Sequence, residues 1–275
     1  MKLLGLDNIL WELNQLKSPC NILFQGARGT GKTTLSRYLA NKFEFDFIET
    51  EGSILDKRQL LKVLLNIVEN KKKTILYIDE IHSLPEKGNE ILYKVMEGNI
   101  LNLQDREGNS YQIHLPEIYI IGATTKPAEL TKPLLSRFQL ILTMPDYSIK
   151  VLAKIIQLKF PFSIRESLEI ANCVFTPREA INLSIRVNNL KEKMGVREGL
   201  KFLGFKRGLS IKERQYLKIL SNLERASKLT MSASLQLDKS FIEEIENKLI
   251  RKGLIIITMQ GRKLTDKGFE LISRL

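Results

Sequence analysis

The chain contains the stretch Gly26-Ala-Arg-Gly-Thr-Gly-Lys-Thr33, with an apolar run at 21–25 before it and a helical run at 34–40 after it. Glycines at this spacing let successive backbone N–H groups face phosphate oxygens, where a Cβ atom would collide. The lysine reaches the outer phosphates, and the hydroxyl of the threonine after it is placed to hold Mg²⁺. A strand before the loop and a helix after it favour a nucleotide site over a plain glycine-rich turn.

The phosphate-binding residues are expected in and directly after this loop. ATP is the expected nucleotide, with Mg²⁺ as its counter-ion. The residues assigned to binding ATP are Gly26, Gly29, Gly31, Lys32, Thr33 and Thr34.

Two carboxylates, Asp79 and Glu80, come directly after the apolar run 74–78. In an open α/β sheet, the carboxyl end of such a strand lies beside the phosphate loop. We expect Asp79 to hold Mg²⁺ together with Thr33, and Glu80 to orient and polarise the attacking water. The alternative is a pair of ordinary acids that cap the next helix.

The charge balance points to an anionic partner. The 275 residues include 43 Lys and Arg against 31 Asp and Glu, which gives a formal charge of +12 and a pI near 9.6. A polyanion such as nucleic acid is the expected partner, although a basic surface can also serve solubility alone. The run 201–214 is basic, and further basic residues follow in the last part of the chain: Lys248, Arg251, Lys252, Arg262, Lys263 and Lys267.

The composition is that of a globular protein, with 43% hydrophobic and 27% charged residues. No apolar stretch approaches the length of a membrane span, and the N-terminus lacks the pattern of a secretory signal. Two cysteines are too few for a disulfide framework. We therefore expect a cytoplasmic protein without a membrane partner.

The first part of the chain alternates strand-like runs with helical periodicity, which predicts an α/β fold with a parallel sheet and helices on both faces. A helical apolar face lies at 58–70. We place this domain at 1–145. Its expected strands are Cys20–Gln25, Phe45–Glu49, Thr74–Ile78, Ile118–Gly122 and Gln139–Thr143.

The remainder predicts two smaller domains. An all-α lid at 146–207 is expected to hold three helices, the last beginning at Pro177 after the cap residue Thr176. At 208–275, two helices separated by a polar break and followed by two short strands predict a winged helix. The expected elements are helices 147–160, 163–172, 177–193, 210–223 and 239–251, a strand at 253–258 and a turn at 259–261.

Taken together, these motifs resemble the AAA+ ATPases and, within them, the RuvB family, which drives branch migration of Holliday junctions. The resemblance covers roughly residues 5 to 270, and Arg28 departs from the small residue or proline usual at its place. The strings that carry it are Gly26-Ala-Arg-Gly-Thr-Gly-Lys-Thr-Thr34, Tyr77-Ile-Asp-Glu-Ile-His-Ser-Leu84, Ile121-Gly-Ala-Thr-Thr125, Pro133-Leu-Leu-Ser-Arg-Phe138 and Thr176-Pro-Arg-Glu-Ala180.

The resemblance implies further catalytic roles. Thr125 matches sensor 1, with Thr124 as the fallback, and Arg178 matches sensor 2 in the lid. Arg137 matches the arginine finger, which reaches the nucleotide of a neighbouring subunit and therefore implies a homo-oligomeric ring, a hexamer. For each position the simpler alternative is structural: a strand cap for the threonine, and a surface charge or helix-start residue for the arginines.

The resemblance also implies partners. A hairpin at 96–115 matches the segment that binds RuvA, the junction-binding protein, although a hairpin packed on its own domain is the alternative. In the winged helix, Arg262 and Lys263 match the wing and are expected to contact duplex or four-way junction DNA. Such contacts read phosphates rather than sequence. Winged helices also serve as protein contacts, so this role stays open here.

Two functions follow from these observations. The first is an ATP-driven motor that moves duplex DNA and drives branch migration. The second is a nucleotide-switched loader or adaptor that assembles on DNA and recruits a clamp, a helicase or a recombinase. A motor predicts DNA-stimulated ATP hydrolysis and junction movement, whereas a loader predicts slow hydrolysis without movement.

Overall fold

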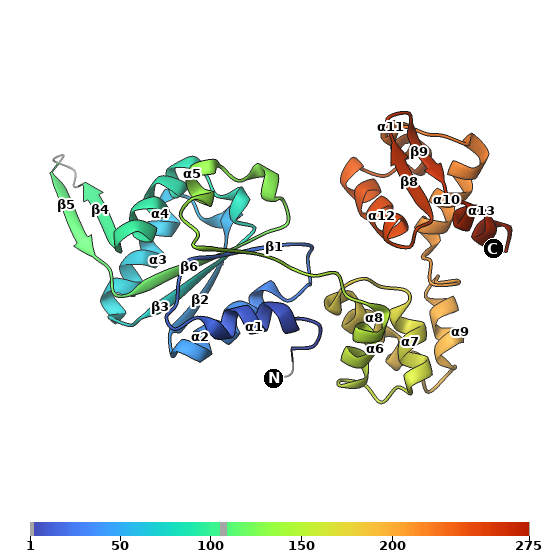
Figure 1. Ribbon diagram of the computed structural model, residues 1–275, viewed down its shortest axis with the longest axis horizontal. Coiled ribbons are helices and arrows are strands. Elements are labelled where there is room, and N and C mark those ends of the chain that lie inside the picture. Colours follow the sequence, from blue (N-terminus) through green and yellow to red (C-terminus); the bar gives the residue numbers. More distant parts are fainter. Residues whose placement is uncertain (1–2, 105–108, 275) are drawn as a thin grey trace. The chain divides into compact units, whose positions relative to one another are not determined.

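The computed structural model describes residues 3–104 and 109–274, which form two compact units (Figure 1). Unit 1 comprises the residues up to Asp146 together with Thr176–Arg178. Unit 2 comprises Tyr147–Phe175 and the chain from Glu179 onward. Each unit is built around cores of its own, as the next paragraphs describe.

Unit 1 contains a five-stranded parallel sheet in the order β2-β3-β6-β1-β7. The strand near the centre, β6, lies between β1, which leads into the phosphate loop, and β3, which leads into Asp79 and Glu80. The predicted α/β sheet is therefore confirmed, with small shifts at strand ends. The strands are β1 (Ile22–Gln25), β2 (Asp46–Glu51), β3 (Thr74–Asp79), β6 (Ile118–Thr124) and β7 (Leu140–Thr143).

Helices cover both faces of this sheet, with α1 (Asp7–Gln15) and α2 (Lys32–Phe43) on one face and α3 (Lys57–Asn70) and α4 (Glu86–Gly98) on the other (Figure 1). Helix α3 forms because Leu60, Leu64 and Ile67 repeat at helical spacing and bury one stripe in the core. Asp56 caps its start by accepting a hydrogen bond from the backbone N–H of Gln59 at 2.7 Å.

The expected hairpin is present as β4 (Ile100–Gln104) paired antiparallel with β5 (Ser110–His114). The part of its connecting segment at 105–108 lies outside the described residues. Leu101 is buried, and Leu103 and Ile113 pack against the core of unit 1. The apolar side of the hairpin therefore serves its own domain, while Tyr111 exposes 53% of its surface.

The lid in unit 2 has its own core and four helices in the described chain, so the expectation of three was wrong. The additional helix is short and buries only a few side chains, and at its start the Glu198 carboxylate accepts a hydrogen bond from the backbone N–H of Gly195 at 3.3 Å. Such a segment gives little periodic signal. The helices are α6 (Ile149–Gln157), α7 (Ile164–Ala171), α8 (Pro177–Leu190) and α9 (Val196–Phe202).

The predicted winged helix is confirmed, with a core of its own. The expected polar break after α10 was wrong in part, because it contains the helix α11, capped by Ser227. Met231 and Leu235 of α11 are buried although most of its residues are polar or small. The elements are α10 (Ile211–Leu223), α11 (Lys228–Leu235), α12 (Lys239–Arg251), β8 (Ile255–Thr258), β9 (Gly261–Leu264) and α13 (Asp266–Ser273). Among the described residues, no helix combines the length and apolar character that crossing a bilayer requires.

Candidate functional site

The phosphate loop turns from β1 into α2 through residues with positive φ. Gly31, at φ 104°, occupies the N-cap of α2 in a left-handed conformation that a residue with a Cβ adopts only under strain. Gly29, at φ 77°, lies so close to Arg178 that an added Cβ would be 2.5 Å from the Cβ of that arginine. The loop thus leads directly into the N-terminus of α2, where anions are stabilised.

Lys32 lies folded over the loop. Its Nζ donates to the carbonyl oxygens of Gly26 at 2.8 Å and Ala27 at 3.0 Å. Burial lowers the pKa of this amine, and the nearby carboxylates of Asp79 and Glu80 oppose that shift. The ammonium of Lys32 is thus held against the backbone of the phosphate loop.

The candidate Mg²⁺ ligands, Thr33 and Asp79, lie beside the side chain of Tyr77. The hydroxyl of Thr33 donates to the Tyr77 hydroxyl at 3.0 Å. Burial raises the pKa of Tyr77, and the nearby carboxylate of Asp79 adds to that shift, so Thr33 and Asp79 both lie close to this phenol. One hydroxyl and one carboxylate next to a phosphate site match the ligands that Mg²⁺ takes from proteins. The residues fit the ion that the sequence implies.

Glu80 begins a tight turn after β3 and has a left-handed backbone, with φ 46° and ψ 49°. This conformation costs a residue other than glycine about 1 kcal/mol. Gly52, directly after β2, supports it: a Cβ at Gly52 would lie 2.5 Å from the Glu80 carbonyl oxygen. Sequence reasoning missed Gly52, although its position opposite the end of β3 in a parallel sheet is a signal that could have found it.

The Glu80 carboxylate is held by donors from three segments. Thr125 donates twice, from its backbone N–H to Oε2 at 3.0 Å and from its hydroxyl to Oε2 at 2.8 Å. The Nε of Arg28 donates to Oε1 at 3.1 Å, and the Nδ1 of His82 lies 3.3 Å from Oε2. The roles of Arg28 and His82 were missed, because nothing in their spacing marks them as neighbours of Glu80.

These contacts set the charge of Glu80. Burial alone would raise the pKa of its carboxyl, but the hydrogen bonds from Thr125 and Arg28 and the nearby His82 lower the pKa below its ordinary value. Glu80 is thus favoured as the carboxylate, the form that accepts a hydrogen bond from water.

The two threonines at the end of β6 have different surroundings. Thr125 contacts Glu80 directly, whereas Thr124 is fully buried and its Oγ1 lies 2.9 Å from His82 Nδ1. The backbone N–H of Lys126 also donates to the Thr124 hydroxyl at 3.0 Å. The preferred sensor residue, Thr125, is therefore the one that reaches the acid, while Thr124 orders the histidine behind it.

The two candidate arginines occupy different places. The backbone N–H of Arg178 donates to the carbonyl oxygen of Gly29 at 3.3 Å, which brings it to the phosphate loop. Arg137, after α5 (Lys132–Leu135), instead contacts residues of α4 and α5: its guanidinium donates to Glu97 at 2.5 Å and lies 4.1 Å from the Tyr93 ring centroid. The structure thus gathers Arg178 with the loop but gives Arg137 a separate setting.

The expected wing residues also differ from each other. The guanidinium of Arg262 forms two bonds to Glu246, at 2.8 and 3.1 Å, and the Tyr216 hydroxyl donates to the same carboxylate at 2.9 Å. Glu246 is 2% exposed. This geometry does not favour the expected contact of Arg262 with DNA, because its charge is already used inside the domain. Lys263, next to it on β9, has no such partner among the described residues.

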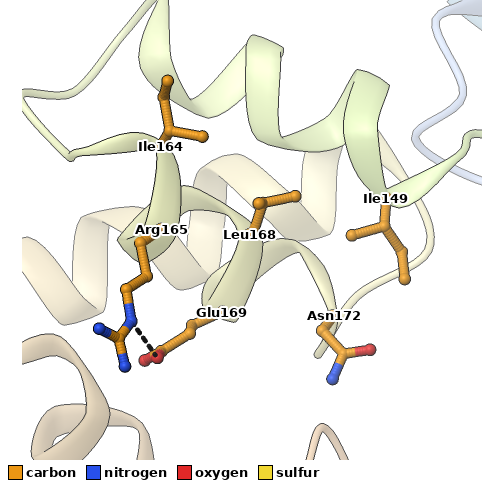
Figure 2. Close-up of a pocket in the computed structure, with 6 residues that line it drawn as sticks. All are labelled: Ile149, Ile164, Arg165, Leu168, Glu169 and Asn172. Atoms are coloured by element: carbon orange, nitrogen blue, oxygen red, sulfur yellow. Dashed lines mark ion pairs between the residues drawn. The ribbon is translucent and has the colours of Figure 1, made fainter.

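A separate pocket of about 550 Å³ lies on the lid, where α6 and α7 leave the apolar side chains of Ile149, Ile164 and Leu168 exposed (Figure 2). An ion pair between Arg165 and Glu169, at 3.7 Å, lies at its edge. None of the phosphate-loop residues lines this pocket, so it is distinct from the nucleotide site.

Comparison with known proteins gives the same assignment along most of the chain. Residues 13–144 match the P-loop domain of the Holliday junction DNA helicase RuvB, and residues 206–273 match the RuvB C-terminal winged helix domain. The chain is 32% identical over 278 residues to the Holliday junction branch migration complex subunit RuvB of Mesomycoplasma hyopneumoniae strain 7448, with 93% of this chain and 86% of the relative covered. The chain belongs to the RuvB family of AAA+ ATPases.

Two further comparisons support this assignment. The corresponding subunit of Wolbachia sp. subsp. Brugia malayi is 34% identical, with 92% of this chain and 83% of the relative covered. The solved Thermotoga maritima RuvB, titled a Holliday junction branch migration motor, superposes with a TM-score of 0.81 at 26% identity and covers 98% of this chain and 95% of the other. The ATPase expected from the loop is thus that of the RuvB family.

Proposed function

We propose that the chain is a ring-forming motor that hydrolyses ATP to move duplex DNA and thereby drives branch migration of Holliday junctions. The observation that carries the proposal is the setting of Glu80, held as a carboxylate by Thr125 in a RuvB-family chain that also contains a winged helix. Three domains at 1–145, 146–207 and 208–275 divide this work into nucleotide binding, lid movement and DNA contact. The protein acts in the cytoplasm.

The phosphate loop holds the nucleotide. Its glycines, with Lys32, Thr33 and Thr34, take the phosphates of ATP, and Thr33 and Asp79 hold Mg²⁺. Bound MgATP supplies the bond that is cleaved and the counter-charge beside it. The buried Lys32, already aimed at the rim of the loop by two carbonyl oxygens, adds a fixed positive charge where negative charge gathers.

Glu80 orients the attacking water. Thr125 donates to both carboxylate oxygens and Arg28 donates to Oε1, which together fix the plane of the carboxylate that faces the water. Thr125 acts as sensor 1 through this contact, and Arg178 acts as sensor 2 from its place against Gly29. The fixed carboxylate positions the water in line, which is the main task left to the protein in phosphoryl transfer.

Arg137 completes a neighbouring site. Its contacts with Glu97 and Tyr93 hold the guanidinium on α4, away from the loop of its own chain. A finger of this kind functions only in an oligomer, for which we propose a hexameric ring.

The winged helix contacts duplex or four-way junction DNA, with Lys263 on the wing as a phosphate contact. A RuvA-like protein binds the β4–β5 hairpin, for which Tyr111 is the exposed aromatic side chain. Aromatic residues commonly anchor such interfaces.

A junction-migration assay tests the proposal. The purified chain, with ATP, Mg²⁺ and a synthetic four-way junction, should dissociate the junction into two duplexes when the RuvA of its host is added. The Glu80→Gln variant should bind ATP but should not move the junction, and the Lys32→Ala variant should not bind the nucleotide. ATP-dependent assembly on DNA with slow hydrolysis and no junction movement would overturn the motor in favour of a loader.

A further inference from the structure

A basic pocket of about 330 Å³ lies in the lid, between α7, α9 and the connector that leads to the winged helix. Its lining includes Arg197 together with Lys201, Lys206 and Arg207, and the last three belong to the basic run at 201–214 found in the sequence. Arg197 is neutralised by Glu169 at 3.0 Å. Lys201 and Arg207 are exposed and have no ion-pair partner among the described residues.

Arg207 stands at the tip of an unusual turn. Lys206 and Leu209 exchange backbone hydrogen bonds at 2.9 and 3.0 Å, and both residues between them have positive φ, 52° for Arg207 and 75° for Gly208. These are the features of a type I′ turn, whose first central position favours Asn, Asp or Gly. An arginine there is strained, and strain of this kind gathers at functional positions.

The turn is anchored from both sides. A Cβ at Gly208 would lie 2.5 Å from the Asn172 amide nitrogen, so the turn packs directly on the end of α7. The ammonium of Lys252, next to α12, donates to the carbonyl oxygens of Asn172 and Gly208, each at 2.7 Å. Burial lowers the pKa of Lys252. The turn that carries Arg207 is therefore held in place by α7 on one side and by Lys252 of the winged helix on the other.

We propose that this pocket is a second phosphate-backbone contact for duplex DNA, with Arg207 and Lys201 as its cations. The inference rests on the proposed DNA function and extends it from the wing to the lid. Duplex DNA fits better than an acidic protein because the cations belong to the same unit as the winged helix, in a chain of charge +12. Phe202, 71% exposed beside Lys201, adds an aromatic face to the basic surface.

The test is Arg207→Asn, which removes the charge and places at the turn a residue that favours its conformation. Binding of a fluorescein-labelled duplex is measured by anisotropy over a series of KCl concentrations. One lost phosphate contact should weaken binding about three-fold and reduce the slope of log K against log salt by ~1. The melting temperature should be unchanged or higher. Lys201→Ala should show the same loss, and the pair of substitutions about twice the slope change.

The matched control is Arg186→Asn, which removes one exposed charge from α8 of the lid and should leave the slope unchanged. An Arg207→Asn variant that binds duplex with the parent affinity and slope would overturn the proposal. An equal loss in Arg186→Asn would also overturn it, as a general charge effect. Loss of RuvA-dependent stimulation with unchanged duplex binding would assign the pocket to a protein instead. Failure of the parent chain to bind DNA would refute the proposed function itself, which these variants do not address.

Discussion

Three parts of the chain surround the carboxylate of Glu80: the phosphate loop through Arg28, the end of β6 through Thr125, and the turn after β3 through His82. Burial raises the pKa of Glu80, but the donors outweigh it. Since the proposed role of orienting water requires the ionised form, these contacts should extend the working range of Glu80 toward acid pH.

Removal of Arg28 should therefore change the pH dependence of ATP hydrolysis. In Arg28→Ala the pKa of Glu80 rises, so the acid limb of the kcat profile should move to higher pH, toward the ordinary glutamate value of about 4.3. Arg28→Lys keeps the charge and should move the limb less. Arg37→Ala, which removes an arginine paired instead with Glu49, should leave it in place. An unmoved limb in a correctly folded Arg28→Ala protein would contradict this assignment.

The wing offers a second test at this scale. Arg262→Ala leaves the buried Glu246 without its guanidinium, and breaking such a pair costs about 3–5 kcal/mol of the free energy of unfolding. Lys263→Ala should leave stability unchanged and weaken duplex binding. Urea denaturation and DNA titration of both variants separate the two effects. Loss of DNA affinity at full stability in Arg262→Ala would restore the contact expected from the sequence.

At the scale of elements, strong periodicity made the sheet and the long helices predictable, because their apolar residues repeat along several turns or strands. The places of the phosphate loop between β1 and α2, and of Asp79 and Glu80 at the end of β3, were predictable because a recognisable motif follows a buried strand in each case. Helices α9 and α11 were not, since each is short and is stabilised by caps and by packing on neighbours. Likewise, the pairing of Arg28 with Glu80 and that of Arg262 with Glu246 could not be predicted, because the partners are far apart in the sequence and meet only in the folded chain.

The contact between Gly52, after β2, and Glu80, after β3, can be tested by a substitution that adds one methyl group. Gly52→Ala places a Cβ 2.5 Å from the Glu80 carbonyl oxygen, so the left-handed turn must shift and move the carboxylate. We expect ATP binding to persist and kcat to fall ten-fold or more, since small misplacements of a catalytic group are costly. Gly195→Ala, where an added Cβ meets nothing within 4 Å, is the control. Equal activity in the two variants would argue against this support.

At the scale of the whole molecule, Arg137 and the phosphate loop belong to one chain, yet the guanidinium contacts α4 and α5. The sequence could indicate the proposed finger only through the resemblance, because the proposed role of Arg137 requires a second copy of the chain. Activity should therefore be a property of the assembly.

Mixing experiments address this directly. Arg137→Ala should be inactive alone, because no subunit receives a finger. Adding Glu80→Gln subunits should restore part of the ATP hydrolysis, because these supply intact fingers to neighbours with intact Glu80. Steady-state hydrolysis is measured over a range of mixing ratios. As a control, subunits carrying both substitutions should not restore ATP hydrolysis. If Glu80→Gln subunits also failed to restore hydrolysis at every mixing ratio, that result would contradict a site shared between subunits.

The ammonium of Lys252 joins the carbonyl oxygen of Asn172, the residue that caps the end of α7, to that of Gly208 in the turn before the winged helix. A chimera that grafts another family member's C-terminal module after residue 207 would remove both Lys252 and Gly208 and leave the carbonyl oxygen of Asn172 without this donor. Module exchange in this protein should therefore preserve the junction best when the incoming segment brings a lysine at the place of Lys252, whatever DNA surface it carries.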